Sequence, residues 1–127
     1  MPFHPPHFQL VDNGFLVVIT KPLNVTENPC SYLLSVRNAL TDELKDWGYD
    51  FRDGAVCMDG SDAQVWFEYP PSLKVTREQI RRHVFLALKW WNLNRETMPY
   101  LLPSFVSIGF APEPTANLEP LVSVETT

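Results

Sequence analysis

The chain has 127 residues, of which 45% are hydrophobic and 20% charged, and its net charge is -5. This length and balance are typical of one globular domain and exclude a disordered chain. The negative charge argues against nucleic acid or an anionic membrane as the partner. No stretch approaches the roughly 18 apolar residues of a membrane span, and residues 1–10 lack the basic and apolar regions of a signal peptide. We therefore expect a cytoplasmic protein that does not bind membranes.

The first part of the chain predicts a strand followed by a helix. Residues 1–7 are a proline-rich lead-in, and residues 8–11 and 15–20 flank Asp12-Asn13-Gly14, a strong hairpin signal. Asn28 and Pro29 suit the cap and first position of a helix. Apolar residues then recur at helical spacing until Gly48, which can end the helix. They are Leu33, Val36, Leu40, Leu44 and Trp47.

The second part predicts a hairpin, a helix and a last strand. Arg52-Asp53-Gly54 and residues 59–62 have the composition of turns, so we expect strands over residues 55–58 and 63–69. Thr76 with Gln79 three positions later is the signature of a capping box that opens a second helix. Its apolar stripe consists of Ile80, Val84, Leu88 and Trp91. Residues 105–110 form the final strand.

This order of elements predicts an α+β protein with the ferredoxin-like β-α-β-β-α-β arrangement, a two-layer sandwich. The N-terminal hairpin would add one strand to it. We expect a single domain over residues 1–110 and a proline- and glutamate-rich C-terminal tail over residues 111–127. Within the tail, residues 118–124 either add a short edge strand or are disordered.

The expected strands are apolar on both faces, whereas the two helices can cover only one face of the sheet. Because side chains alternate along a strand, Val65 and Phe67 would face the helices. Gln64, Trp66 and Glu68 would then lie on the opposite face. A second subunit, another protein or the chain's own tail must cover this second face.

Three side chains are candidate acids or bases if the protein is an enzyme: Glu68 beside Trp66, His83 on the second helix, and Asp59 in a turn. Glu68 has an alternative role as the partner of an arginine at an interface, and His83 as a residue at the edge of the core. The sequence has no phosphate-binding, dinucleotide or nucleophile-elbow motif. His4 and His7 are too few for a metal site. We therefore expect no cofactor and no metal.

Charge is unevenly distributed along the chain. Residues 27–62 contain eight acidic and three basic residues, whereas residues 74–95 contain six basic and one acidic. Arg77, Arg81 and Arg82 lie in the first turns of the second helix, where the helix dipole favours anions. Trp90 is turned about 100° from the core residue Trp91, which predicts that it is exposed. The basic helix either receives an acidic partner or neutralises acidic parts of the same fold or of another subunit.

These features favour a noncatalytic protein–protein interaction module that buries an apolar sheet face in a homo-oligomer or hetero-oligomer. The partner would be a second copy or a protein with an acidic surface. Its binding residues would be Gln64, Trp66, Arg77, Arg81, Arg82 and Trp90. The alternative is a small cofactor-free enzyme of the dimeric α+β barrel type that acts on an apolar metabolite by acid–base catalysis. A sheet that stacks RNA on Trp66 and Phe110 is disfavoured by the acidic balance.

Two further questions stay open at this level. Cys30 and Cys57 form one disulfide or remain two thiols. Asn24-Val25-Thr26 matches a glycosylation sequon, which is relevant only to a secreted chain.

Overall fold

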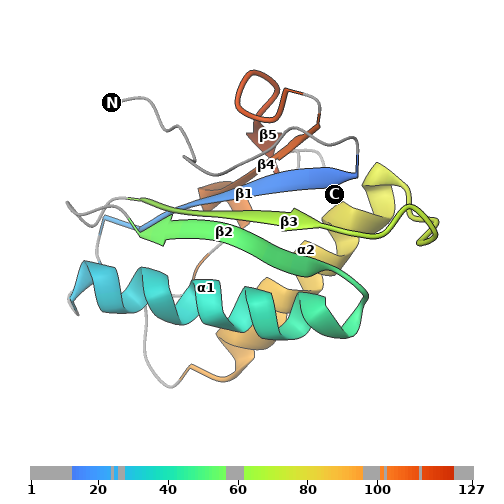
Figure 1. The fold of residues 1–127 in the computed structure, drawn as a ribbon. Coiled ribbons are helices and arrows are strands. Elements are labelled where there is room, and N and C mark those ends of the chain that lie inside the picture. Colours follow the sequence, from blue (N-terminus) through green and yellow to red (C-terminus); the bar gives the residue numbers. More distant parts are fainter. Residues whose placement is uncertain are drawn as a thin grey trace.

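The computed structural model describes residues 13–23, 25, 28–56, 62–95, 101, 103–111 and 113–121. Over this part the chain is a mixed α+β fold with two helices and a five-stranded antiparallel sheet (Figure 1). Neither helix is long and apolar enough, in the described part, to cross a membrane. The strand expected over residues 8–11 lies outside the described residues, as do Asn24 and Cys57. The elements are β1 (Gly14–Thr20), α1 (Pro29–Asp46), β2 (Asp50–Val56), β3 (Asp62–Glu68), α2 (Arg77–Leu93), the 3-10 turn η1 (Pro103–Phe105), β4 (Val106–Phe110) and β5 (Glu119–Pro120).

The strands are arranged in the order β2-β3-β1-β4-β5, and each is antiparallel to its neighbours. β1 is central and pairs with β3 over seven residues and with β4 over five. Figure 1 shows both helices on the same side of this sheet. β2 and β5 are the edges, and β5 is only two residues long.

Both helix starts predicted from capping residues are confirmed. The side chain of Asn28 accepts a hydrogen bond from the backbone N–H of Ser31 at 3.0 Å, and α1 begins at Pro29. Thr76 and Gln79 form the reciprocal bonds of a capping box at 3.1 and 2.8 Å. α1 ends at Asp46, and Gly48 follows with φ of 101°, a left-handed conformation that glycine adopts without strain.

The turn predicted at Arg52-Asp53-Gly54 is wrong, because these residues lie inside β2. Phe51 pairs with Phe67 and Asp53 with Trp66, so Arg52 is an extra residue at a β-bulge. A bulge on an edge strand accommodates polar residues and protects the edge from pairing with other chains. Turns and bulges use the same residue types, so composition did not separate them.

The core lies between the helices and one face of the sheet. Phe15, Val65 and Phe67 belong to the cluster that also contains the apolar stripes of α1 and α2. Leu16 and Trp66 belong to a separate small cluster on the opposite face. The predicted alternation of β3 is therefore confirmed, and it places Gln64, Trp66 and Glu68 on the face away from the helices.

Candidate functional site

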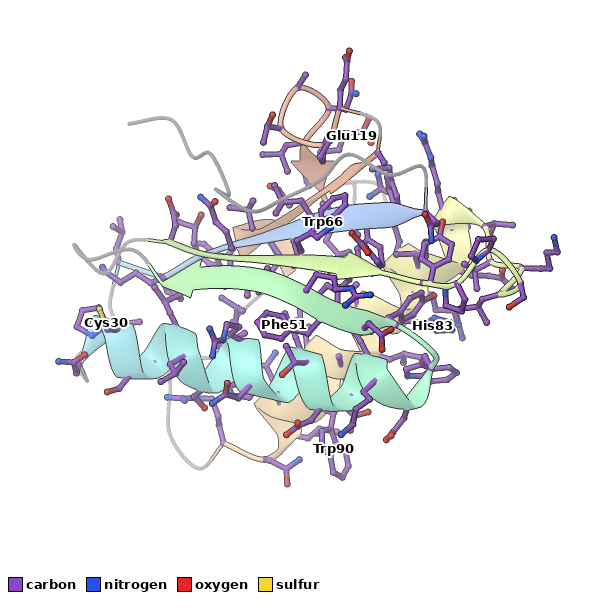
Figure 2. The ribbon with its side chains drawn as sticks, in the orientation of Figure 1. Cys30, Phe51, Trp66, His83, Trp90 and Glu119 are labelled. Atoms are coloured by element: carbon purple, nitrogen blue, oxygen red, sulfur yellow. The ribbon has the colours of Figure 1, made fainter. Side chains whose placement is uncertain are left out.

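Three side chains of the second face of the sheet are buried within this single chain. Trp66 is 1% exposed, Leu16 1% and Gln64 7%. Gly14 on β1 contributes to this burial, because a Cβ at that position would overlap the indole ring of Trp66. The ring therefore packs directly on the backbone of β1. Figure 2 shows Trp66 on the side of the sheet opposite the helices.

Glu68 is held by two hydrogen bonds on this second face. The indole N–H of Trp66 donates to Glu68 Oε2 at 2.8 Å, and Nε of Arg52 donates to Oε1 at 3.3 Å. Both carboxylate oxygens are thus engaged by residues of the same chain, one of them from the bulge in β2. The bond from Arg52 to Glu68 links β2 to β3. Within the described residues, Oε1 of Gln64 is buried without a hydrogen-bond partner.

His83 lies in a cluster of aromatic rings where the end of α1, the start of β2 and α2 meet. The ring of Trp47 stacks on His83 with centroids 4.0 Å apart. The hydroxyl of Tyr49 lies 2.8 Å from His83 Nδ1. Tyr69, which follows β3, packs edge-on against Tyr49. The sequence singled out only His83, and Tyr49 gave no signal beyond its position after Gly48.

The electrostatics of this cluster keep both polar groups neutral near pH 7. Burial, reinforced by Tyr69, raises the pKa of Tyr49 to about 12. Burial, reinforced by the charge of Arg82, lowers the pKa of His83 below 6.5. Tyr49 therefore keeps its proton and His83 is a neutral imidazole near pH 7. The hydrogen bond joins the Tyr49 hydroxyl to Nδ1 of His83, and the tautomer of the imidazole determines which of the two groups donates.

The arginines of α2 fall into two groups. Arg81 contacts the C-terminal segment, defined here as residues 113–121, through an ion pair with Glu119 at 2.8 Å. The guanidinium of Arg77 lies over the ring of Phe110, 5.0 Å from its centroid. Arg82 is exposed and forms no ion pair with any described residue. Only Arg82 of the three is thus unengaged by the C-terminal part of the chain.

Large apolar side chains are exposed on the outer side of the helices. The predicted exposure of Trp90 is confirmed at 54%, and Leu93 is 71% exposed. Figure 2 shows Trp90 pointing away from the sheet. Lys89 is exposed beside Trp90, and Asp42 and Asp46 are exposed on α1. Aromatic and aliphatic groups ringed by charges are typical of protein contact surfaces.

Glu68 and His83, the two candidate catalytic residues that the structure describes, are not assembled into one site. His83 lies in the helix layer, whereas Glu68 lies on the far face of the sheet. Asp59 lies outside the described residues. Among the residues that are described, no group of three or more histidine, cysteine, aspartate or glutamate side chains is placed to hold a metal ion. Comparison of the chain with protein-family models, with curated proteins and with solved structures finds no match in any of the three.

Proposed function

We propose that this protein is a noncatalytic protein–protein interaction module that forms a homodimer through the outer side of its two helices. The observation that carries this proposal is Trp90, which is 54% exposed on α2. It lies next to Lys89, which makes no ion pair with any described residue. A tryptophan exposed among unpaired cations gains most when a partner covers it.

The helical period determines which residues of α1 and α2 lie on the outer side of the helices. Arg82, Leu86, Lys89 and Leu93 recur at intervals of three and four, so they form one stripe along α2. Asp42 and Asp46 are four residues apart and share the outward side of α1. We call these six residues, together with Trp90, the outer helix surface. It is basic and apolar along α2 and acidic along α1.

A second copy of the chain is the occupant that this charge pattern favours. α1 and α2 pack side by side, so the acidic and basic stripes belong to one continuous layer. In a two-fold dimer each contact occurs twice, because residue i meets j and j meets i. If α2 of one copy faces α1 of the other, Lys89 and Arg82 meet Asp42 and Asp46 at both ends. The apolar side chains then meet near the centre.

The proposed contact differs from the sheet face expected from the sequence. Trp66 and Gln64 are buried within a single chain, so a partner would find little of either side chain to cover. The outer helix surface, by contrast, carries two of the most exposed large apolar side chains among the described residues, Trp90 and Leu93. We therefore propose that the contact lies on the helices.

Light scattering tests the homodimer directly. The unaltered chain is expected to have twice the 14.6 kDa mass of one chain. Trp90→Ala is expected to weaken dimerisation about 30-fold, the equivalent of a 2 kcal/mol interface residue. Lys89→Glu and Asp42→Lys should each shift the mass toward one chain, and their combination should restore the dimer. A single-chain mass at every concentration would overturn the proposal.

Lys74→Glu is the matched control for Lys89→Glu. Lys74 is exposed but precedes α2, so the same charge reversal occurs away from the outer helix surface. Its dimerisation should equal that of the unaltered chain. If Lys74→Glu weakened the dimer as much as Lys89→Glu, net charge rather than the proposed contact would be responsible. Circular dichroism would verify that each variant is folded.

For the fold, we propose that β1 to β4 and both helices form a ferredoxin-like unit to which β5 is added as an edge strand. The order of elements along the chain supports this assignment, as does the neighbour order β2-β3-β1-β4. Both helices cover one face, as this arrangement requires. A solved structure with a different order of these four strands would refute it.

A small cofactor-free enzyme is the second candidate, and the hydrogen bond between Tyr49 and His83 is the observation in its favour. A half-buried imidazole with a lowered pKa is neutral at pH 7 and can act as a base. A screen of small apolar compounds by NMR tests this role. Saturable shifts of the His83 ring resonances would support it. A screen without any ligand at His83 would end it.

A further inference from the structure

The C-terminal segment returns to the sheet and pairs with β4. Ser107 lies opposite Pro120 and Ile108 opposite Glu119, and the backbone N–H of Leu121 donates to the carbonyl of Val106 at 2.7 Å. Figure 1 shows β5 beside β4, so the segment occupies what would otherwise be a free strand edge. We call residues 106–108 and Arg81 the β4 edge site.

Side chains at alternate positions of the segment make the specific contacts. Glu119, which is labelled in Figure 2, binds the guanidinium of Arg81 at 2.8 Å. Leu121, two residues later, is 3% exposed and belongs to the main core cluster. Pro120 between them is exposed. Main-chain pairing with anchors at alternate positions is how proteins bind extended peptides at a sheet edge.

Arg81 binds the segment through both of its terminal nitrogens. Nη2 binds the carboxylate of Glu119, and Nη1 donates to the carbonyls of Pro120 at 3.1 Å and Leu121 at 3.2 Å. The guanidinium also lies 5.6 Å from the ring centroid of Phe110, which helps to orient it. The planar fork of arginine suits such simultaneous recognition of a carboxylate and backbone carbonyls.

The backbone pairing that holds the segment is short. β5 pairs with β4 over two residue pairs, whereas β1 pairs with β4 over five and with β3 over seven. The ion pair is largely exposed, since the side chain of Glu119 is 66% accessible, and such pairs contribute little to stability. Much of the segment's anchoring to the sheet therefore comes from Leu121 and from the hydrogen bonds of Arg81, and a competing peptide would have to replace both.

We propose that the β4 edge site is a binding site for extended acidic peptides, and that the chain's own Glu119-Pro120-Leu121 occupies it as an internal competitor. The ligand has a carboxylate side chain two residues before a large apolar side chain. Tethering gives the internal segment a high effective concentration, so a free peptide binds only when the segment is weakened or outcompeted. This proposal is independent of the proposed dimer, because it uses no residue of the outer helix surface.

Fluorescence anisotropy with a labelled peptide tests the proposal on the full chain. The probe is the peptide of residues 113–121, Glu-Pro-Thr-Ala-Asn-Leu-Glu-Pro-Leu. It should bind the Leu121→Ala chain at least tenfold more tightly than the unaltered chain. Glu119→Gln should also tighten peptide binding, by a smaller factor and without altering the core, because the ion pair that it removes is exposed. Failure of the peptide to bind either variant, with both folded by circular dichroism, would overturn the proposal.

Two neighbouring arginines provide the matched control. In the Leu121→Ala chain, Arg81→Ala should abolish peptide binding, whereas Arg82→Ala should leave it unchanged, because Arg82 forms no ion pair with the described segment. An Arg81→Glu chain should prefer the peptide that carries Glu119→Arg. Equal losses for Arg81→Ala and Arg82→Ala would assign the binding to general positive charge and overturn the specific site. A doubling of mass that depends on Leu121, without peptide binding, would instead assign the site to segment exchange between copies.

The same measurement in a Trp90→Ala chain separates this proposal from the dimer. Peptide affinity should be unchanged there even if dimerisation is lost. Loss of peptide affinity in Trp90→Ala would show that the site depends on the dimer and would contradict the independence claimed above.

Discussion

The hydroxyl of Tyr49 lies 2.8 Å from Nδ1 of His83 and joins the connection before β2 to α2. Trp47, two residues before Tyr49, stacks on the same imidazole. The short connection after α1 thus contacts α2 through a hydrogen bond and a stacked ring. Burial in this cluster shifts the pKa of both groups, reinforced by Tyr69 for Tyr49 and by Arg82 for His83, and these shifts lead to the first two predictions.

The stability of the protein should fall as the pH is lowered through the region below 6.5. The folded chain holds the pKa of His83 below its usual 6.5 through burial and the charge of Arg82. The unfolded chain therefore binds a proton at a higher pH than the folded chain, and the stability from this group is complete only above pH 6.5. Denaturant unfolding on either side of pH 6.5 would measure the decline. In His83→Gln the part of the pH dependence that is due to His83 should vanish. An unchanged dependence of the unfolding free energy on pH would contradict the role given to His83.

At the alkaline end, Tyr49 should destabilise the folded chain once the pH rises above 10. Its folded pKa of about 12 exceeds the usual value of 10.0, so the unfolded chain loses this proton first. The stability from this group is complete below pH 10 and declines as the pH rises to about 12. Unfolding curves for the unaltered chain and Tyr49→Phe should differ in this range. Tyr49→Phe should also lose about 1 kcal/mol at neutral pH, because it removes a hydrogen bond.

Gly14 and Trp66 should be energetically coupled. Gly14→Ala would force a methyl group into the indole ring of Trp66, and overpacking of this kind costs about 1–3 kcal/mol. Trp66→Ala should cost about 3–5 kcal/mol, as expected for a fully buried aromatic residue. Once the ring is gone, Gly14→Ala should cost much less. A double-mutant cycle by denaturant unfolding would measure this difference, and strict additivity would mean that the two positions do not touch.

The capping box of α2 should contribute measurably to stability. Thr76→Ala removes the acceptor for the backbone N–H of Gln79 and should cost about 1 kcal/mol, within the range of about 0.5–2 kcal/mol for such caps. Thr115→Ala is the control, because Thr115 is exposed and lies in the C-terminal segment. Equal stability of Thr76→Ala and the unaltered chain in urea would show that the box is energetically neutral.

Helix ends and strand alternation were predictable because they depend on residues close together in sequence. Asn28, Thr76 and Gln79 cap their helices through bonds that span three positions. The alternation that separates Phe67 from Trp66 depends only on the geometry of one strand. The start of β2 was missed for a local reason as well, since aspartate and glycine serve both turns and bulges.

The candidate sites were predictable only in part. Exposure of Trp90 followed from its angle on the helix, and the position of Glu68 followed from the period of β3. The contacts that Trp90 and Glu68 make with other residues did not follow from the sequence. A carboxylate beside a tryptophan is consistent with catalysis, with an interface or with a contact that stabilises the fold. Only the positions of Arg52 and Trp66, which both donate hydrogen bonds to Glu68, identify the stabilising contact.

By itself, the sequence determined two capped helices, the strand alternation and a basic second helix, because each is encoded within a few consecutive residues. The tertiary structure alone decided which of these residues meet. Tyr49 reaches His83 across 34 positions, and Arg81 reaches Glu119 across 38. Such contacts depend on how whole elements pack against one another. A local pattern of side chains does not tell which residues 34 or 38 positions apart will meet.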